Sequence, residues 1–160
     1  MNNIWAPWRI KYIETMVNED LQEKGCIFCG KQDKEDHQDF VLKRGQHSFV
    51  ILNIYPYNNG HLLFAPYDHI ADISDFNKEQ ILEIFSFINL FKKRMSDRMN
   101  CDGFNVGVNI GKTAGAGVED HVHFHLVPRW NGDTNFMPVI TDTKVIPQAL
   151  EQVWELLEKE

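Results

Sequence analysis

Short runs rich in valine, leucine, isoleucine and phenylalanine recur along the chain, separated by Gly, Pro, Asn and Asp. This pattern is typical of β-strands bounded by turns. It predicts four strands, over residues 40–44, 47–53, 61–66 and 102–109. Only Gly45 and Gln46 separate the first two runs, which favours a tight hairpin.

A helical period begins at Asn77. The stretch NKEQ (77–80) has the pattern of a capping box, and the apolar residues that follow at helical spacing are Ile81, Ile84, Phe85, Ile88, Phe91 and Met95. This helix is predicted to run to about residue 98. A final helix is predicted from Pro147, because proline suits the first helical turn. Its buried residues are expected to be Leu150, Val153, Trp154 and Leu157.

Together these segments predict an α+β fold, an antiparallel sheet of about five strands with one long inserted helix and a C-terminal helix. A chain of 160 residues has the length of one ordinary domain. We therefore expect a single domain over 1–160. Its parts would be an N-terminal arm (1–25), a core (26–130) and a C-terminal loop and helix (131–160).

The net charge of -7 argues against a nucleic-acid polymer or an anionic membrane as partner, because both attract clustered Lys and Arg. No apolar run of about 18 residues occurs, and the first residues lack the apolar core of a signal peptide. Three cysteines are too few for a disulfide scaffold. We expect a cytoplasmic protein, with Cys101 as a lone buried thiol.

The fifth predicted strand is HVHFHLVPRW (121–130), in which three histidines alternate with apolar residues. Strand side chains alternate between faces, so His121, His123 and His125 would share one face. A single strand histidine is usually an ordinary core or surface residue. Three in register indicate either a metal site or nucleophilic catalysis on phosphorus by a neutral imidazole.

A glycine-rich loop, GKTAGAG (111–117), directly precedes the histidines. It is not a P-loop, because Val106 stands where that motif needs a glycine and the loop leads into a strand instead of a helix. Its glycines can still turn backbone N–H groups inward to bind an anion, although an ordinary mobile loop fits equally well. Beside the histidines, it favours phosphate chemistry.

The sequence resembles the histidine triad (HIT) superfamily of nucleotide hydrolases and transferases. The resemblance rests on N-I-x-P-x-x-x-G-H at 53–61, the AGAG loop, and the full pattern H-φ-H-φ-H-φ-φ at 121–127. WAPWR (5–9), CIFC (26–29) and DHVHFHLVPRWNGDTNFM (120–137) further resemble a bacterial and archaeal branch that includes diadenosine tetraphosphate phosphorylase-like proteins. The resemblance covers nearly the whole chain and implies one HIT domain.

The resemblance implies a role for each matching residue. His123 would be the nucleophile, forming a covalent nucleotidyl-histidine at the α-phosphate, with His125 and His61 donating hydrogen bonds to the phosphates. The positions matching α-phosphate ligands are Asn109, Gly117 and Val118, and Asn53 matches a ribose contact. The apolar positions matching a purine pocket are Ile27, Phe28, Ile51 and Ile54, although each of them also suits core packing.

One departure concerns the residues before the triad. Relatives of the Hint type carry a polar Gln-Ser or Gln-Thr pair there, whereas this chain has Gly117 and Val118. The side-chain hydrogen bonds of that pair are therefore missing. A Hint-like phosphoramidase activity does not carry over from the resemblance.

Cys26 and Cys29 form a C-x-x-C pair that is half of a zinc site. The resemblance implies that His69 and His121 complete it as a structural Cys2His2 site. Two reduced thiols without metal are the alternative. A redox pair is disfavoured, because no βαβ pattern surrounds the cysteines.

Other functions remain open. The chain could be a non-catalytic nucleotide- or zinc-binding module, or a nucleotidyltransferase related to galactose-1-phosphate uridylyltransferase. The resemblance also implies a homodimer formed through the long helix and a sheet edge. The acceptor, water or inorganic phosphate, is undecided. Arg129, Trp130 and the loop 130–136 are candidates for shaping the acceptor or distal-nucleotide side.

Overall fold

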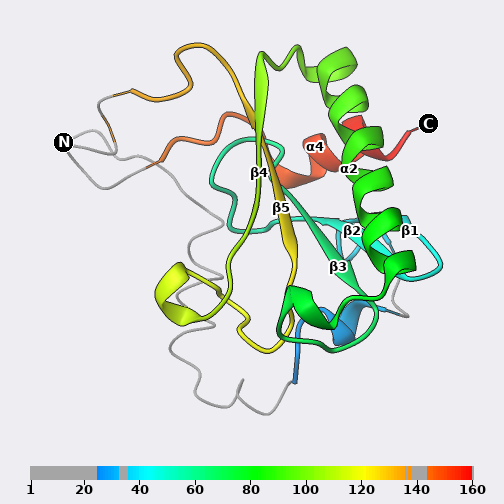
Figure 1. The fold of residues 1–160 in the computed structure, drawn as a ribbon. Helices are drawn as coiled ribbons and strands as arrows, with labels where there is room; N and C mark the ends of the chain where they lie inside the picture. Colours follow the sequence, from blue (N-terminus) through cyan, green and yellow to red (C-terminus); the bar gives the residue numbers. More distant parts are fainter. Residues whose placement is uncertain (1–24, 33–35, 136, 138–143, 160) are drawn as a thin grey trace.

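Five strands form one antiparallel sheet in the computed structural model of the chain, in the order β1-β2-β3-β5-β4 (Figure 1). The strands are β1 (Val41–Arg44), β2 (Ser48–Leu52), β3 (Leu62–Pro66), β4 (Gly103–Val108) and β5 (Phe124–Arg129). The structure describes residues 25–32, 36–135, 137 and 144–159. The predicted N-terminal arm, with WAPWR, therefore lies almost wholly outside the described residues. The α+β class and the five strands are as predicted.

The hairpin between β1 and β2 is held by a side chain from the long helix. Glu83 accepts hydrogen bonds from the backbone N–H groups of Gln46 (2.7 Å) and His47 (2.9 Å) and from the Ser48 hydroxyl (2.6 Å). A Cβ at Gly45 would lie 2.4 Å from the Glu83 carboxyl carbon. A larger residue here would displace the Glu83 carboxylate from these three hydrogen bonds, so glycine lets the side chain hold the hairpin.

Helix α2 (Lys78–Met99) begins with the predicted capping box between Asn77 and Gln80. Its buried face differs in part from the prediction. Phe87 is buried, whereas Ile81 and Phe85 are 41% and 48% exposed. The sheet covers only one side of the helix, so the apolar stripe is wider than the buried one.

Helix α4 (Leu150–Glu158) buries Val153, Trp154 and Leu157. The prediction that this helix begins at Pro147 is wrong. Ala149 has ψ 152°, an extended conformation, and is the residue at which the helix is capped. Because the chain is extended before the helix, Gln148 contacts Asn59, which precedes β3. Asn59 Nδ2 donates to Gln148 Oε1 over 2.5 Å.

β5 is shorter than predicted, because His121 and His123 precede it. On one side, β4 ends at Val108, opposite Phe124. On the other side, β3 ends at Pro66, which has no N–H to donate to β5. The Val122 N–H instead donates to the Ile70 carbonyl (2.7 Å). His121 and His123 nevertheless lie on one side, because both rings contact that of Phe28, with centroids 5.0 and 4.7 Å apart.

The sheet separates two apolar clusters. Both helices pack on one face, where the strands contribute Val50, Leu62, Phe64 and Leu126 to the larger cluster. The other face carries a smaller cluster around Phe28 and Phe49. His125 pairs with Leu63 of that second cluster, so the histidine side chains lie on the face away from the helices. No helix within the described part of the chain is long and apolar enough to cross a bilayer.

Candidate functional site

Three histidine rings lie in contact on the face of the sheet away from the helices. His125 belongs to β5, His123 directly precedes β5, and His61 directly precedes β3. The ring centroids of His123 and His125 are 4.9 Å apart, and those of His61 and His125 are 5.1 Å apart. The antiparallel pairing of β3 with β5 therefore joins the two histidine motifs, which are more than sixty residues apart in sequence.

The hydrogen bonds of His123 leave one ring nitrogen for chemistry. Its Nδ1 lies 2.9 Å from the His121 carbonyl oxygen, which can only accept, so Nδ1 carries the proton. The Nε2 atom then holds a lone pair. Burial lowers the pKa of His123, and the ring is neutral near pH 7. The geometry is that of an imidazole prepared as a nucleophile.

A chain of hydrogen bonds assigns the protons of the other two rings. The Tyr57 N–H donates to His61 Nδ1 over 3.0 Å, so His61 is protonated at Nε2 and donates to His125 Nδ1 over 2.9 Å. His125 must then carry its proton on Nε2. This buried atom has no hydrogen-bond partner among the described residues. It is a donor without an acceptor, beside the proposed nucleophile.

Burial keeps this pair of rings neutral. Burial, with a smaller contribution from the neighbouring histidines, lowers the pKa of His61 to about 3 and that of His125 to about 4. A neutral ring accepts at one nitrogen and donates from the other, whereas a charged ring would donate from both. We call the chain of hydrogen bonds from the Tyr57 N–H through His61 to His125 the histidine relay. The relay from Tyr57 to His125 is therefore stable through the physiological pH range.

A second group of side chains lies at the other end of the histidine segment. One ligand atom from each of Cys26, Cys29, His69 and His121 lies within 4.8 Å of all the others. Cys26 Sγ is 3.2 Å from His121 Nδ1, and Cys29 Sγ is 3.3 Å from His69 Nδ1 and 3.6 Å from His121 Nδ1. Sulfur and nitrogen ligands of one tetrahedral zinc ion are about 3.6 Å apart. These four residues fit a closed metal site.

The second ring nitrogen of His121 supports the same assignment. His121 Nε2 lies 3.0 Å from the Pro66 carbonyl oxygen, so this nitrogen carries the proton and Nδ1 presents its lone pair to the thiols. The ring is fully buried. Phe28 packs between the two sites, with its ring 5.0 Å from that of His121 and 4.7 Å from that of His123.

The predicted phosphate loop is built around two glycines in the left-handed region, Gly111 (φ 79°) and Gly115 (φ 91°). Asn109 donates from Nδ2 to the Gly115 carbonyl over 3.3 Å and closes the loop. Gly117 is exposed, and Val118 packs partly against the Phe28 cluster. The N–H groups of Ala114, Gly115 and Ala116 donate to carbonyls within the loop. The N–H groups that remain as the predicted anion ligands are therefore those at Gly117 and Val118.

The predicted ribose and base residues lie in different surroundings. The Asn53 amide lies 3.2 Å from His61 Nδ1 and accepts from the Tyr55 N–H (2.9 Å), so it borders the histidine relay. Phe28 and Ile51 are buried in the core. Ile27 is 53% exposed, and Ile54 lines a separate cavity of about 460 Å³.

Sequence patterns did not indicate Tyr57 or the two carbonyl groups that orient His121 and His123. The Tyr57 ring stacks on His125 with centroids 5.7 Å apart and lies 4.6 Å from His61. Backbone carbonyls leave no trace in a sequence. An exposed tyrosine four residues before a motif histidine is also no signal by itself.

Comparisons with known proteins agree with this geometry. The model of the HIT domain family matches residues 34–132. An AP-4-A phosphorylase of Mycobacterium tuberculosis is 34% identical over all of this chain and 84% of its own length. An adenosine 5'-monophosphoramidase of Saccharomyces cerevisiae is 36% identical over 67% of this chain and 64% of its own. A Zn-bound histidine triad family protein from Mycobacterium smegmatis superposes with a TM-score of 0.67 and 25% identity, over 84% of this chain and 91% of that one.

Proposed function

This chain belongs to the HIT family, and on that premise we propose that it transfers a nucleotidyl group from a dinucleoside polyphosphate through His123. The preferred substrate class is an adenine dinucleoside polyphosphate such as diadenosine tetraphosphate. The relative that matches the chain from end to end is named for AP-4-A, which supports this class over a phosphoramidate. The domain is proposed to extend over 1–160.

The first step is attack of His123 Nε2 on the α-phosphorus. A phosphorus–nitrogen bond forms, the bond from the α-phosphorus to the bridging oxygen breaks, and its electron pair leaves on that oxygen as ATP. The His125 Nε2–H donates a hydrogen bond to the departing oxygen. The observation that carries the proposal is that this buried N–H has no acceptor among the described residues, so it is a donor where negative charge develops.

In the second step the acceptor attacks the same phosphorus and the bond to His123 breaks, returning the electron pair to Nε2. Inorganic phosphate gives ADP, and water gives AMP with release of a proton. The proposed α-phosphate contacts are Asn109 and the backbone at Gly117 and Val118, with Asn53 on the ribose and Ile27, Phe28 and Ile54 toward the base. Acceptor choice defines a phosphorylase or a hydrolase.

We further propose zinc at Cys26, Cys29, His69 and His121. When bound, zinc would join the cysteine segment to the end of β3 and fix His121, whose carbonyl oxygen orients His123. The metal would thus have a structural role, away from the reacting phosphate. Thiols serve as zinc ligands only when reduced, which fits the expected cytoplasmic location.

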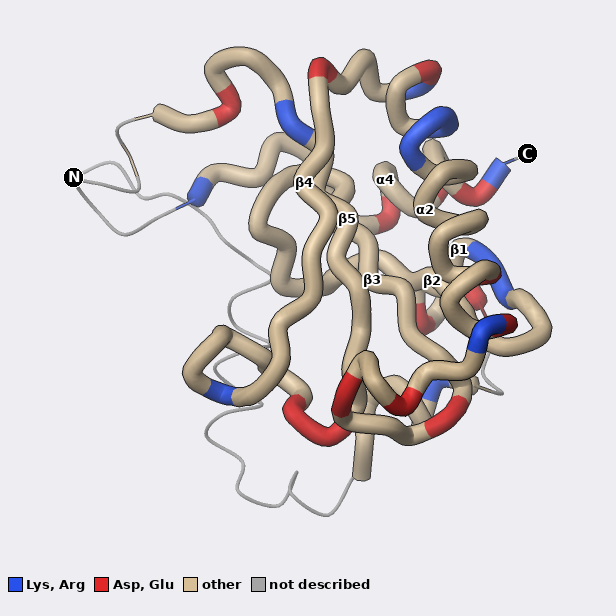
Figure 2. Tube along the Cα trace, in the orientation of Figure 1, with Lys and Arg blue, Asp and Glu red and all other residues tan. Residues whose placement is uncertain are grey.

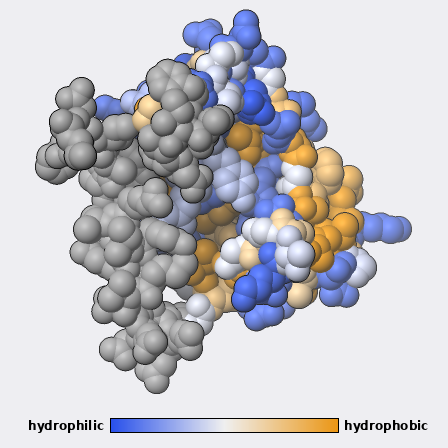
Figure 3. Space-filling model, turned by 90° about the vertical axis from the view of Figure 1, so that its left-hand side faces the viewer, coloured by the Kyte–Doolittle hydropathy of each residue, from blue (hydrophilic) through white to orange (hydrophobic). Residues whose placement is uncertain are grey.

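A homodimer is proposed through α2 and the edge strand β4. Exposed apolar side chains lie on both elements, including Leu82 (71%), Phe85 (48%) and Val106 (46%), and Figure 3 shows apolar side chains gathered on one side of the surface. Sedimentation analysis should give a dimer, and Leu82→Lys should shift it toward monomer. A monomeric parent protein would refute the pairing.

The test of the proposed function is product analysis after incubation with diadenosine tetraphosphate, with and without inorganic phosphate. ADP and ATP formed only with phosphate identify a phosphorylase, and AMP and ATP in both samples identify a hydrolase. A parallel incubation with adenosine 5'-phosphoramidate tests the activity named for the yeast relative. No cleavage of either compound would contradict the enzyme assignment and favour a binding module.

A further inference from the structure

We infer that a cavity next to the histidine relay, lined by Asn105, Arg129, Thr134 and Lys144, binds the phosphate groups beyond the α-phosphate. These are either the distal phosphates of the dinucleoside polyphosphate or the inorganic phosphate acceptor. The cavity has a volume of about 340 Å³, and its further lining residues are Tyr57, Asn58 and Val127. The inference rests on the proposed function and specifies how its site handles the leaving or attacking phosphate.

Strand register makes this cavity continuous with the catalytic histidines. His125, Val127 and Arg129 share one face of β5. Across the ladder, Gly107 pairs with His125 and Asn105 pairs with Val127. A Cβ at Gly107 would have no described atom within 4 Å, so the space beside His125 at this position is open among the described residues.

The guanidinium of Arg129 points back toward the relay. Arg129 itself pairs with Gly103, yet its Nη1 donates to Asn105 Oδ1 over 2.8 Å, opposite Val127 and two residues nearer to His125. The backbones of His125 and Arg129 are separated by about 13 Å along the strand. The turned side chain shortens this gap to a length that a chain of phosphates can bridge.

Several N–H groups of Arg129 and Lys144 have no hydrogen-bond partner within the part of the chain that the structure describes. Arg129 has five N–H groups, and three are engaged with Asp133 and Asn105. The Lys144 ammonium has three N–H groups, and one donates to the Asp133 carbonyl over 2.7 Å. Because Asn105 Oδ1 accepts from Arg129, the NH2 group of Asn105 points away from the guanidinium. Such a set of cationic and amide donors suits phosphate oxygens.

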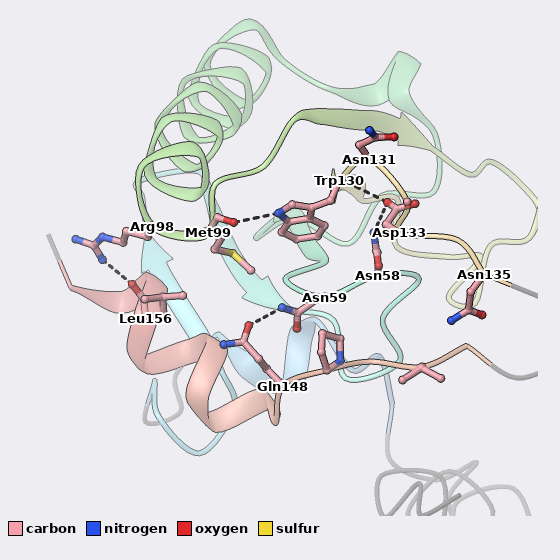
Figure 4. A pocket seen from close by; sticks show the side chains of 13 residues that line it. Asn58, Asn59, Arg98, Met99, Trp130, Asn131, Asp133, Asn135, Gln148 and Leu156 are labelled. Carbon is pink, nitrogen blue, oxygen red and sulfur yellow. Dashed lines mark hydrogen bonds between the residues drawn. The ribbon is translucent and has the colours of Figure 1, made fainter. Parts of the chain in front are cut away.

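The carboxylate in this group does not oppose an anion. The side chain of Asp133 is 7% exposed. Its oxygens accept from Arg129 (2.6 and 2.9 Å), from Asn58 (2.8 Å), from the Trp130 N–H (3.3 Å) and from Thr134 (3.2 Å). Figure 4 shows Asp133 between Asn58 and Trp130, where it borders a second cavity. Arg129, Lys144 and Asp133 together carry one net positive charge.

The charged residues differ between the two ends of the histidine segment, and this difference favours binding of a polyphosphate on the side of Arg129. We call the end of the histidine segment at the Cys26, Cys29, His69 and His121 group the metal end. The loops 67–77 and 118–120 lie there and carry acidic residues, seen at the lower end of the molecule in Figure 2. The cationic pair lies at the opposite end of β5. The carboxylates of these two loops therefore disfavour a polyanion on that side, whereas Arg129 and Lys144 offer it cationic donors on the other.

The test compares Lys144→Gln with the matched control Lys93→Gln on the exposed side of α2, where the Lys93 side chain is 78% exposed. Kinetics are measured with diadenosine tetraphosphate and with the p-nitrophenyl ester of AMP, which has no phosphate beyond the α-phosphate. Loss of one charge-assisted hydrogen bond should lower affinity about tenfold. The ester should be turned over equally by Lys144→Gln and the parent protein when water is the acceptor.

Two results support the inference and separate its two sources of phosphate. A tenfold fall in kcat/KM for diadenosine tetraphosphate at saturating inorganic phosphate indicates the distal phosphates. A tenfold rise in KM for inorganic phosphate, with unchanged single-turnover cleavage, indicates the acceptor. Equal losses on the ester, or no change on any substrate, would overturn the inference.

A binding measurement keeps the inference testable if the parent protein cleaves none of these substrates and the proposed function fails. Calorimetric titration with inorganic tripolyphosphate should show binding to the parent and to Lys93→Gln, weakened about tenfold in Lys144→Gln. Arg129→Lys, which keeps the charge but not the forked contact with Asp133, should also bind more weakly. Absence of binding to the parent, or equal binding by all variants, would refute the cavity as a phosphate site.

Discussion

The two ends of the histidine segment use the same residue type in opposite ways. At the metal end, both ring nitrogens of His121 are committed, one to the Pro66 carbonyl and the other to the cysteine thiols. At the relay end, His125 accepts from His61 and keeps a buried N–H that no described residue accepts. A histidine with both nitrogens satisfied holds structure, whereas one with an unpaired nitrogen retains a hydrogen bond for a reacting group.

His123 lies between these ends and depends on both. Its Nδ1 is oriented by the carbonyl of the neighbouring residue at the metal end, and its ring contacts His125 at the relay end. The proposed chemistry thus requires a rigid support on one side and a free donor on the other. The following predictions test whether the two ends can be separated by experiment.

The largest effect is expected from His123→Asn. Loss of the nucleophile should lower turnover of diadenosine tetraphosphate at least about a thousandfold, while the melting temperature stays close to that of the parent. Steady-state kinetics and thermal unfolding measure the two quantities. The control is His47→Asn in the β1–β2 hairpin. Turnover retained within tenfold would exclude His123 as the nucleophile.

Cys26→Ser tests the metal end. Loss of a metal ligand should lower the melting temperature by roughly 10 °C and abolish stoichiometric zinc, since a closed site contributes directly to folding. Elemental analysis and thermal unfolding measure both. The control is Cys101→Ser, because Cys101 lies apart from the group, with Sγ 3.6 Å from the Met95 carbonyl. Parent protein that holds no zinc would contradict the assignment.

At the relay end, His125→Gln and His125→Asn form a matched pair. A glutamine amide N–H reaches about as far as imidazole Nε2, whereas asparagine ends near Nδ1. We expect kcat to fall about tenfold for glutamine and about a hundredfold for asparagine, because only glutamine restores a donor to the leaving oxygen. Equal losses in the two variants would argue against donation from Nε2.

The smallest effect concerns pH. The pKa of His61 is lowered from 6.5 to about 3 by burial and by its histidine neighbours, so between these values the unfolded chain takes up a proton that the folded chain does not. The stability contributed by neutral His61 is therefore complete above pH 6.5 and is lost as the pH falls toward 3. The melting temperature should fall less between pH 7 and pH 5 in His61→Gln than in the parent. Parallel curves would show that His61 does not contribute.

The sequence by itself determined the elements and the residue types of the site. Periodicity located the strands and the capping box of α2, and the spacing of His121, His123 and His125 placed them on one face even though β5 begins at Phe124. These features depend on short-range geometry, in which the side-chain period follows directly from backbone conformation. For the same reason, the family pattern could name Cys26 and Cys29 as half of a metal site.

Only the tertiary structure decided which nitrogen of each histidine is free. That outcome depends on the Tyr57 N–H and on the carbonyls of Pro66 and His121, which are backbone groups that every residue carries. It also decided that α4 begins after Pro147 and that Arg129 turns back toward the relay. Long-range packing brings these groups together, and a local pattern contains no information about partners distant in sequence.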